Sequence, residues 1–294
     1  MKTVGVIVNY NDAETTGRLV QKIRSYACLN QIIVVDNAST DRSWERLLML
    51  QDKKVSVIRA GDNGGYGAGN NLGIRYGIKR YGATHALVCN PDIMFSQDCI
   101  CQMQKIFKNH PEVGAVTAKM ADSAYKNWKN GWPLRPFWGE LLAMGPISRR
   151  LFHRIINYPD SYLNGKKAVY VDVVHGSMVM IDTKAFKQCG GYDEGIFLYQ
   201  EEAILARRMK KAGYRTVLVL NQEYEHQHGA SITKSVKNAI ARQKLREDSV
   251  MYYFRHYLHI GKGKQWIARI WFGLIRTEII LGQIVDRGGA VLRR

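Results

Sequence analysis

The sequence lacks the cysteine patterns that stabilise secreted domains or bind zinc. It has five cysteines, an odd number, and no C-x-x-C pair. An odd set without paired spacing argues against both a disulfide framework and a zinc site. We therefore interpret Cys28, Cys89, Cys99, Cys101 and Cys189 as reduced thiols, which favours the cytoplasm.

Long apolar runs are also missing. No run of about 18 apolar residues is present, so the sequence predicts no membrane-spanning helix. The first residues, MKTVGVIVNYND, become polar at Asn9 before an apolar segment of signal-peptide length is complete. We expect a protein that is not secreted through a signal peptide.

Acidic residues are few relative to basic ones. The chain has 43 Lys and Arg against 25 Asp and Glu, a formal charge of +18. Residues 231–294 hold 13 Lys and Arg against 4 Asp and Glu, a net +9, which is half of the excess. Such a surface can attract nucleic acid, anionic lipid or phosphorylated substrates, and charge alone does not distinguish them.

Short apolar runs rich in β-branched residues alternate with helix-like segments, within 294 residues of which 46% are hydrophobic. The runs are 4–8, 31–36, 55–59, 85–89 and 113–117, and the helical segments between them are 16–26, 43–51, 67–81 and 97–108. This alternation predicts an α/β fold with a doubly wound, mostly parallel sheet and helices on both faces. Ligands bind beyond the carboxyl ends of such strands. The polar residues there should therefore share one edge: Asn9, Asp36, Asn63 and Asp92.

The alternation stops between residues 120 and 168, where aromatic and basic residues are interrupted by Pro and Gly, and we interpret this stretch as an insertion over the site. Its aromatics offer flat faces for sugar or lipid, or they are buried under a flap: Trp128, Trp132, Phe137 and Trp138. Strand patterns return at 169–181 and 216–220, on either side of a helix that ends near Gly213. We expect one domain over residues 1–230, with halves 1–118 and 119–230, and a helical basic C-terminal segment over 231–294.

The C-terminal segment has a Trp-rich apolar stripe. Trp266, Ile270 and Leu274 share a helix face with Ile267, Trp271 and Ile275, while basic residues flank it. Such a helix can lie on an anionic membrane surface. A core helix or a homodimer helix is the alternative.

Asp36 ends the second predicted strand, in VVDNASTD. At the carboxyl edge, this carboxylate could accept hydrogen bonds from a base or a ribose. It could equally cap or bend the turn before the next helix. Both alternatives stay open on this stretch.

The glycine-rich segment NGGYGAGNNLG, residues 63–73, follows the third strand and opens a helix. Its glycines permit close backbone approach, and free N–H groups at a helix start can bind an anion. It has neither the G-x-x-x-x-G-K-[ST] spacing nor the G-x-G-x-x-G spacing. The segment is therefore a phosphate-loop candidate, with a plain glycine turn as the alternative.

Asp92 ends the fourth strand in Asn90-Pro91-Asp92. Pro91 stiffens the strand exit, so Asp92 should project at the edge, where it could hold a divalent cation that also contacts diphosphate oxygens. A turn-initiating aspartate is the alternative. His226 and His228 follow a later strand and compete as a further ligand, with a structural histidine as the alternative.

Two acids, Glu201 and Glu202, begin a helix in YQEE. Adjacent helical residues point in different directions, so the two carboxylates should have different roles. Simple complementation of the helix dipole is the alternative for either residue.

The order of these motifs is more specific than any one of them. VNY, VVDNAST, NGGYGAGNN, NPD, HGSMVMI, GGYDEGIFLYQEE and HQHGAS follow one another as they do in a known family. The sequence resembles the inverting family 2 glycosyltransferases of GT-A fold, and among them the rhamnosyltransferase-like enzymes of bacterial polysaccharide assembly. The resemblance covers about residues 3–231.

The resemblance implies a site for a nucleoside-diphosphate sugar. Residues around the nucleotide and the donor sugar would be Val8, Asn9, Tyr10, Asp36, Asn63, Gly64, Gly65, Asn70, Asn90, His175 and Gly176. Asp92 would occupy the last position of the family's D-x-D metal motif, and Asn90 the first. A Mg²⁺ or Mn²⁺ ion would therefore depend on phosphate, water and His226 as well.

The resemblance also implies the catalytic residues. Glu202 aligns with the catalytic base, where the family has Asp, and Glu201 precedes it. Asp193 would line the approach to the acceptor. A further departure is Ile204, where many relatives carry another acid.

The expected function is transfer of a sugar from a UDP- or dTDP-linked donor to a saccharide acceptor, polyprenyl-linked or similar, in cell-surface polysaccharide assembly. We expect peripheral contact with anionic lipid at the inner face of the cytoplasmic membrane and no nucleic-acid partner. One alternative is a nucleotidyltransferase, which should have a Gly-rich basic loop after the first strand; VNYNDAETTG has none. The other is a non-catalytic basic module that binds nucleotide or lipid.

Overall fold

The computed structural model describes residues 1–121, 130–226 and 238–291. The chain divides into two compact units. Unit 1 comprises residues 1–134 and 159–235, and unit 2 comprises residues 135–158 and 236–294. Much of the predicted insertion, residues 135–158, thus shares a unit with the C-terminal helices. The functional division at residue 230 stays a prediction.

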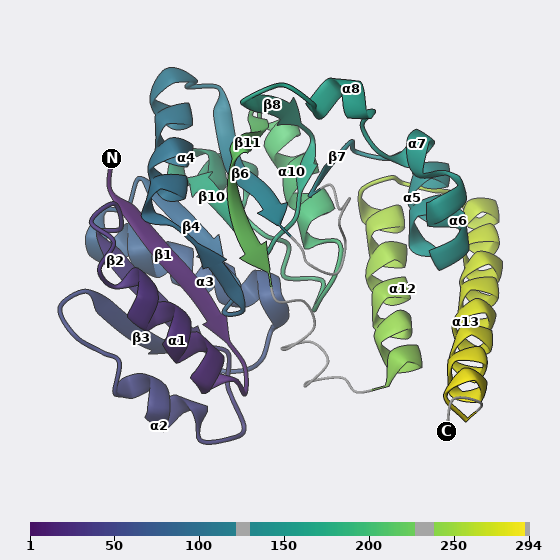
Figure 1. Ribbon diagram of the computed structural model, residues 1–294, viewed down its shortest axis with the longest axis horizontal. Coiled ribbons are helices and arrows are strands. Elements are labelled where there is room, and N and C mark those ends of the chain that lie inside the picture. The colour runs from purple at the N-terminus through teal and green to yellow at the C-terminus, as the bar shows by residue number, and fades with distance from the viewer. Residues whose placement is uncertain (122–129, 227–237, 292–294) are drawn as a thin grey trace. The chain divides into compact units, whose positions relative to one another are not determined.

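Unit 1 contains a nine-stranded sheet in the order β3-β2-β1-β4-β10-β6-β11-β5, with β8 paired to β11 (Figure 1). The strands are β1 Thr3–Asn9, β2 Gln31–Asp36, β3 Val55–Arg59, β4 His85–Cys89, β5 Ile93–Phe95, β6 Val113–Ala121, β8 Ala168–Val171, β10 Met178–Asp182 and β11 Arg215–His226. Within the described residues, β10, β5 and β8 run against the other six strands. The predicted α/β class with a mostly parallel sheet is confirmed.

Helices cover both faces of this sheet, as the alternation of β1 side chains requires. Gly5 faces Ile23 of α1 (Ala13–Ile23), whereas Val4 and Val6 face α3 (Gly65–Tyr81). The remaining helices of unit 1 are α2 Ser43–Leu48, α4 Gln97–Asn109, α8 Asp160–Leu163, α9 Thr183–Cys189 and α10 Glu201–Lys211. A small second sheet pairs β7 (Gly131–Trp132) with β9 (Val173–Val174).

Two strand predictions differ from the structure in their extent. The pattern over 169–181 forms three strands, β8, β9 and β10, rather than one. The strand predicted at 216–220 continues to His226, because a register shift between Val219 and Glu223 carries β11 past its polar residues. A shift of this kind adds residues to one strand and lets the pairing resume beyond it. The resumed part of β11 pairs with β5, a strand that the sequence did not predict.

Unit 2 is helical, with α5 Phe137–Met144, α6 Pro146–Leu151, α7 His153–Ile156, α12 Ala239–His256 and α13 Lys262–Val291. The apolar residues of α13 divide into two faces. Phe272 and Ile275 are buried in unit 2, while Trp266, Ile270 and Leu274 are exposed. The predicted single stripe is therefore wrong, since only one face of the helix is available to an external surface.

Aromatic residues of the predicted insertion also divide. Phe137 is buried, with its ring 4.9 Å from that of Phe254, whereas Trp138 is exposed. Trp132 is half-buried, and Trp128 lies outside the described residues. Among the described residues, no helix is both long and apolar enough to span a bilayer.

Helix α3 approaches the sheet closely through glycines on one face. A Cβ built at Gly73 would lie 2.5 Å from Val6 Cγ1 and 2.9 Å from Val35 Cγ2. Gly69 and Gly77, one turn to either side, would meet Val8 and Val4 at 2.8 and 2.9 Å. These three positions set the distance between α3 and the strands β1 and β2.

We expect Gly73→Ala to destabilise the protein by about 1–3 kcal/mol, because the added methyl overpacks this contact and outweighs the better helix propensity of alanine. Gly17→Ala in α1 is the matched control, since the nearest atom to its Cβ would be Leu50 Cδ1 at 4.0 Å. There, alanine should stabilise by about 0.5–1 kcal/mol. Urea unfolding of both variants measures the difference, and equal effects of the same sign would contradict the close packing.

Candidate active site

The pairing of β5 with β11 brings the two predicted metal ligands together. His226 lies opposite Ile93, so it stands beside Asp92, the preceding residue. His226 Nε2 is 3.2 Å from Asp92 Oδ1, and both residues are buried. Among the described residues, Asp92 Oδ1 nevertheless has no hydrogen-bond partner. A buried carboxylate oxygen without a hydrogen bond is chemically suited to bind a cation, and the role of Asp92 as a metal ligand stays a prediction.

The donor set fits a divalent ion that is shared with a substrate. A carboxylate oxygen and an imidazole nitrogen are both common metal ligands. Among the described residues, no three or more His, Cys, Asp or Glu side chains gather as a closed site. An ion held by Asp92 and His226 would therefore complete its shell with phosphate oxygens and water. His228, the competing ligand, lies outside the described residues.

The turn between β9 and β10 lies next to this pair. The rings of His175 and His226 have centroids 5.6 Å apart. His175 Nδ1 is 2.9 Å from Ser177 Oγ, which is 2.7 Å from the hydroxyl of Tyr224. The backbone N–H of Asn90 donates to Ser177 O over 2.8 Å. The β4 exit, the β9–β10 turn and the end of β11 are thus tied into one cluster.

Gly176 holds the carboxylate of Glu202. Its N–H donates to Glu202 Oε1 over 3.1 Å, and a Cβ at Gly176 would lie 3.0 Å from the same oxygen. The hydroxyl of Tyr66 donates to Gly176 O over 2.6 Å. Any side chain at position 176 would press on the Glu202 carboxylate. The predicted base and the predicted metal pair therefore flank one turn.

The two glutamates at the start of α10 have different surroundings. Glu201 is buried, and within the part of the chain that the structure describes its Oε1 has no hydrogen-bond partner. Burial, followed by the neighbouring charge of Glu202, raises the pKa of Glu201 to about 8. Glu202 is half-buried; burial raises its pKa too, while hydrogen bonding from the Gly176 amide opposes the shift. At neutral pH one proton on Glu201 relieves the repulsion between the pair.

Backbone strain lies directly before these glutamates. Tyr199 and Gln200 have φ angles of 72° and 69°, in the left-handed region. Non-glycine residues held there cost on the order of 1–3 kcal/mol each, and such strain is concentrated at functional sites. The sharp turn sets the direction in which α10 begins.

The start of α3 packs against the same segment. Gly65 has φ +89°, and a Cβ there would lie 2.0 Å from Phe197 O, so this position requires glycine. The N–H of Tyr66 donates to Phe197 O over 3.1 Å, and that of Gly65 to Asn63 Oδ1 over 3.2 Å. Two amides at the helix start thus already have protein acceptors. The diphosphate contact of Gly64 and Gly65 stays a prediction.

Asp36 is fully buried, and both of its oxygens have protein donors. Asn9 Nδ2 donates to Oδ1 over 3.2 Å, and the N–H of Ser39 donates to Oδ2, also over 3.2 Å. Arg59 Nε lies 3.4 Å from Oδ2. These contacts correspond to the turn-holding alternative. The contact of Asp36 and Asn9 with a base or ribose stays a prediction. Val8 packs on Gly69 and Tyr10 is half-buried, and their nucleotide contacts stay predictions too.

Sequence reasoning missed Asn37, which ties the end of β2 to the start of α3. Its Nδ2 donates to Asn63 Oδ1 over 2.8 Å and to Gly65 O over 3.0 Å. Asn37 lies in the VVDNAST motif, in which a role is predicted from sequence only for the carboxylate of Asp36. Tyr66, in the glycine-rich segment, was missed in the same way.

Two further predicted residues are engaged within unit 1. Asp193 Oδ2 lies 3.0 Å from Arg208 NH2, and its Oδ1 accepts from the N–H of Gly195 over 2.9 Å. Asn70 is fully buried and donates to Tyr66 O over 2.9 Å. Both hold local structure, and their contacts with acceptor and donor stay predictions.

Two curated relatives resemble the chain over most of its length. It is 28% identical over 210 residues to a low-salt glycan biosynthesis hexosyltransferase of Haloferax volcanii, covering 70% of this chain and 61% of that protein. It is 24% identical over 220 residues to an N-acetylglucosaminyl-diphospho-decaprenol L-rhamnosyltransferase of Mycobacterium tuberculosis, covering 71% of this chain and 70% of that one. The match thus spans about three fifths of the haloarchaeal protein.

Solved structures share the fold at low sequence identity. A mannosyltransferase of Pyrobaculum calidifontis in complex with GDP-Man and Mn²⁺ aligns with a TM-score of 0.59 at 13% identity, over 100% of this chain and 81% of that one. TarS of S. aureus in complex with UDP-GlcNAc aligns with a TM-score of 0.54 at 12% identity, over 91% and 79%. The GT-A architecture expected from the motifs is confirmed.

The family description "Glycosyl transferase family 2" matches residues 6–190, which is more than half of the chain. This region contains the β1, β2 and β4 exits, the glycine-rich start of α3 and the Gly176 turn. The predicted resemblance is therefore confirmed, and the chain belongs to glycosyl transferase family 2.

Proposed function

We propose that the protein transfers a sugar from a UDP- or dTDP-linked donor to a saccharide on a polyprenyl diphosphate, with inversion, during assembly of a cell-surface polysaccharide. The observation that carries this proposal is the Gly176 turn, which contacts the Glu202 carboxylate and lies beside the Asp92–His226 pair. The mycobacterial relative is named for a diphospho-decaprenol acceptor, and the aligned structures are named for nucleotide-sugar complexes. These names support a nucleotide-sugar donor and a diphospho-polyprenyl acceptor, and the UDP-GlcNAc complex supports UDP as one carrier. The enzyme would act at the cytoplasmic face of the membrane.

In the proposed reaction, Glu202 takes the proton of an acceptor hydroxyl as its oxygen bonds to the anomeric carbon. The bond from that carbon to the phosphate oxygen breaks, and its electron pair leaves with the nucleoside diphosphate. One displacement inverts the anomeric configuration. A divalent ion held by Asp92 and His226 would offset the charge that develops on the leaving group.

The environments of the two glutamates support Glu202 as the base. Glu201 is buried with a pKa of about 8, so it holds a proton at neutral pH and cannot accept another. Glu202 is half-buried, and the Gly176 N–H favours its ionised form. A non-catalytic module would have no need for a carboxylate held in this way. The nucleotidyltransferase alternative still lacks its basic loop after β1.

We expect Glu202→Gln to lower sugar transfer by about 10²–10⁴-fold with nearly unchanged donor affinity, because the amide keeps the shape but cannot take the proton. The assay combines membrane extract with mass-tagged nucleotide sugars and follows both labelled lipid and free nucleoside diphosphate. Glu202→Asp, which restores the family's usual residue, should retain part of the activity. Wild-type turnover in Glu202→Gln would place the base elsewhere, and no transfer by the wild-type protein with any donor would reject the function.

Asp92→Ala should weaken nucleotide binding by at least about tenfold when Mn²⁺ or Mg²⁺ is present, because an ion ligand is lost. Without a divalent ion, the wild-type protein and the variant should bind nucleotide equally. Calorimetry with UDP and dTDP measures both conditions. The exposed Asp62→Ala variant controls for the loss of one negative charge. An unchanged metal-dependent affinity in Asp92→Ala would remove this residue from the metal site.

Glu201 should make stability fall as pH rises. Its folded-state pKa of about 8 exceeds the ordinary value, so the folded protein binds the proton more tightly than the unfolded chain. That stabilisation is complete below the ordinary pKa of glutamate, about 4.3, and is lost as pH rises through the folded value. Glu201→Gln should therefore be more stable than wild type at about pH 9 and similar to it near pH 4.

Denaturant unfolding at both pH values measures this difference, with the exposed Glu45→Gln variant as the control. A stability difference between Glu201→Gln and wild type that does not change with pH would contradict the raised pKa.

A further inference from the structure

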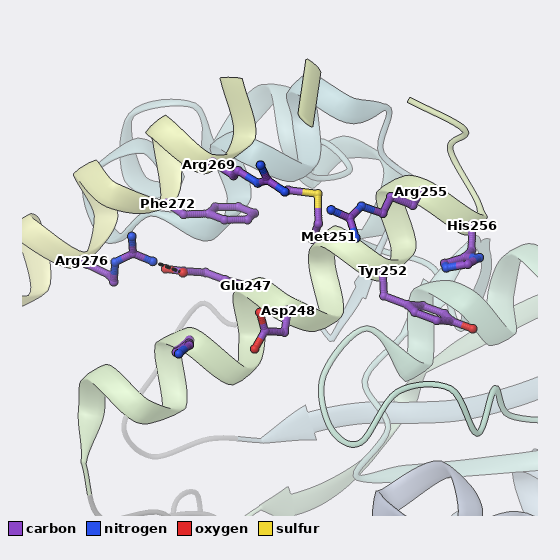
Figure 2. A pocket seen from close by; sticks show the side chains of 10 residues that line it. Glu247, Asp248, Met251, Tyr252, Arg255, His256, Arg269, Phe272 and Arg276 are labelled. Carbon is purple, nitrogen blue, oxygen red and sulfur yellow. Dashed lines mark hydrogen bonds and ion pairs between the residues drawn. The ribbon is translucent and has the colours of Figure 1, made fainter. Parts of the chain in front are cut away.

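Unit 2 contains a pocket of about 440 Å³ between α12 and α13 (Figure 2). Its floor includes the buried apolar side chains of Met251 and Phe272. Its rim is largely charged. An apolar floor below a charged rim suits a ligand that has both a hydrocarbon part and an ionised group.

The pocket lining has an excess of positive charge among the described residues. Glu247 is buried, accepts from Gln243 over 3.1 Å and pairs with Arg276, so this pair is neutral within itself. The lining also holds Lys244, Arg255 and Arg269 against Asp248. Three positive charges less one negative charge leave +2, with His256 neutral. This matches the two negative charges of a diphosphate diester.

Two arginines converge over the floor. In Figure 2 the side chains of Arg255 and Arg269 point toward each other beside Met251. Arg255 Nε donates to the neutral Gln265 Oε1 over 3.1 Å, and within the described residues Arg269 has neither a hydrogen bond nor an ion pair. An anion bound between two converging guanidinium groups would interact with both. Guanidinium also matches phosphate oxygens in bidentate geometry.

The rim of the pocket borders an exposed apolar face of α13. Arg269 is three residues after Trp266 and is therefore its neighbour on the helix surface. Trp266 is 65% exposed, and Ile270 and Leu274 continue the same face. Helices with tryptophan and aliphatic side chains beside basic residues bind at membrane interfaces.

A second apolar strip adjoins the other side of this face. The N–H of Ile147 donates to Glu278 Oε1 over 2.6 Å, and Glu278 is one turn after Leu274. Ile147 begins a series at a spacing of four residues in α6 and α7, in which Leu151 is 73% and Ile155 is 71% exposed. The α13 face therefore lies between an apolar strip and a basic pocket, all within unit 2.

We propose that this pocket binds the diphosphate of a prenyl diphosphate lipid while the exposed apolar face of unit 2 lies in the membrane interface. The choice of a prenyl diphosphate rests on the proposed function, because that is the acceptor lipid it requires. The pocket holds the acceptor's lipid anchor, at a position separate from the reacting hydroxyl. It would make the enzyme selective for acceptors on a lipid over the same saccharide in solution.

The test is calorimetry of the full chain with farnesyl diphosphate, in EDTA and without donor. Farnesyl diphosphate should bind more tightly than farnesol or inorganic diphosphate, because each of these lacks one half of the ligand. Arg255→Ala/Arg269→Ala should weaken its binding by roughly ten- to a hundred-fold, through loss of charge-assisted hydrogen bonds. Lys79→Ala/Arg80→Ala at the end of α3 removes two exposed charges from unit 1 and should leave binding unchanged.

Arg269→Glu is a second variant, which changes one exposed residue and removes no hydrogen bond or ion pair among the described residues. Circular dichroism checks its fold. Unchanged farnesyl diphosphate affinity in both pocket variants would overturn the proposal. If the pocket variants lost binding to phosphatidylglycerol vesicles but kept their affinity for farnesyl diphosphate, the proposal would also be overturned, because the pocket would then recognise anionic lipid in general.

The two proposals fail separately. Sugar transfer by the wild-type protein with undiminished farnesyl diphosphate binding in the pocket variants would reject the pocket alone. Binding of farnesyl diphosphate that depends on Arg255 and Arg269, without sugar transfer under any condition, would reject the proposed function alone.

Discussion

The hydrogen bond from the Gly176 amide to the Glu202 carboxylate is the contact on which the site depends. It joins a turn of the sheet to the start of α10, so residues 26 positions apart in sequence share one location. A Cβ at position 176 would lie 3.0 Å from that carboxylate oxygen, so any other residue there would displace the Glu202 side chain. Tyr66 holds the same turn from α3. The orientation of one acid therefore depends on three separate elements.

A bulge in β11 is equally important to the Asp92–His226 pair, the predicted metal ligands. Without the register shift between Val219 and Glu223, the strand would end before it reached β5. His226 would then not stand opposite Ile93, and Asp92 would be a lone carboxylate. Family 2 membership and the GT-A fold describe the framework. Within this framework, the position of the Asp92–His226 pair depends on the register shift in β11.

The α/β class could be predicted, because strand alternation is visible in sequence, and the visible strand ends indicated where candidate site residues would lie. β5 could not, since a strand of three residues has no periodicity to recognise. The partners of Asp36 could not be predicted either, because a strand-end carboxylate looks the same whether it binds a ligand or the N–H of Ser39. The same limit explains Asn37, whose importance depends on its distance from Gly65. In α13, helical spacing identified apolar residues but not which of them pack inside.

The glycines of α3 have a consequence for donor choice. Gly69, Gly73 and Gly77 pack directly on the valines of β1, so α3 cannot tilt or slide toward the sheet without a steric clash. Its first residues, Gly65 and Tyr66, are held in turn against Phe197 O. Under the proposed function, a donor with a bulkier base or hexose would therefore have to be accommodated by residues outside the start of α3, and a change of donor should leave the glycines of this helix in place.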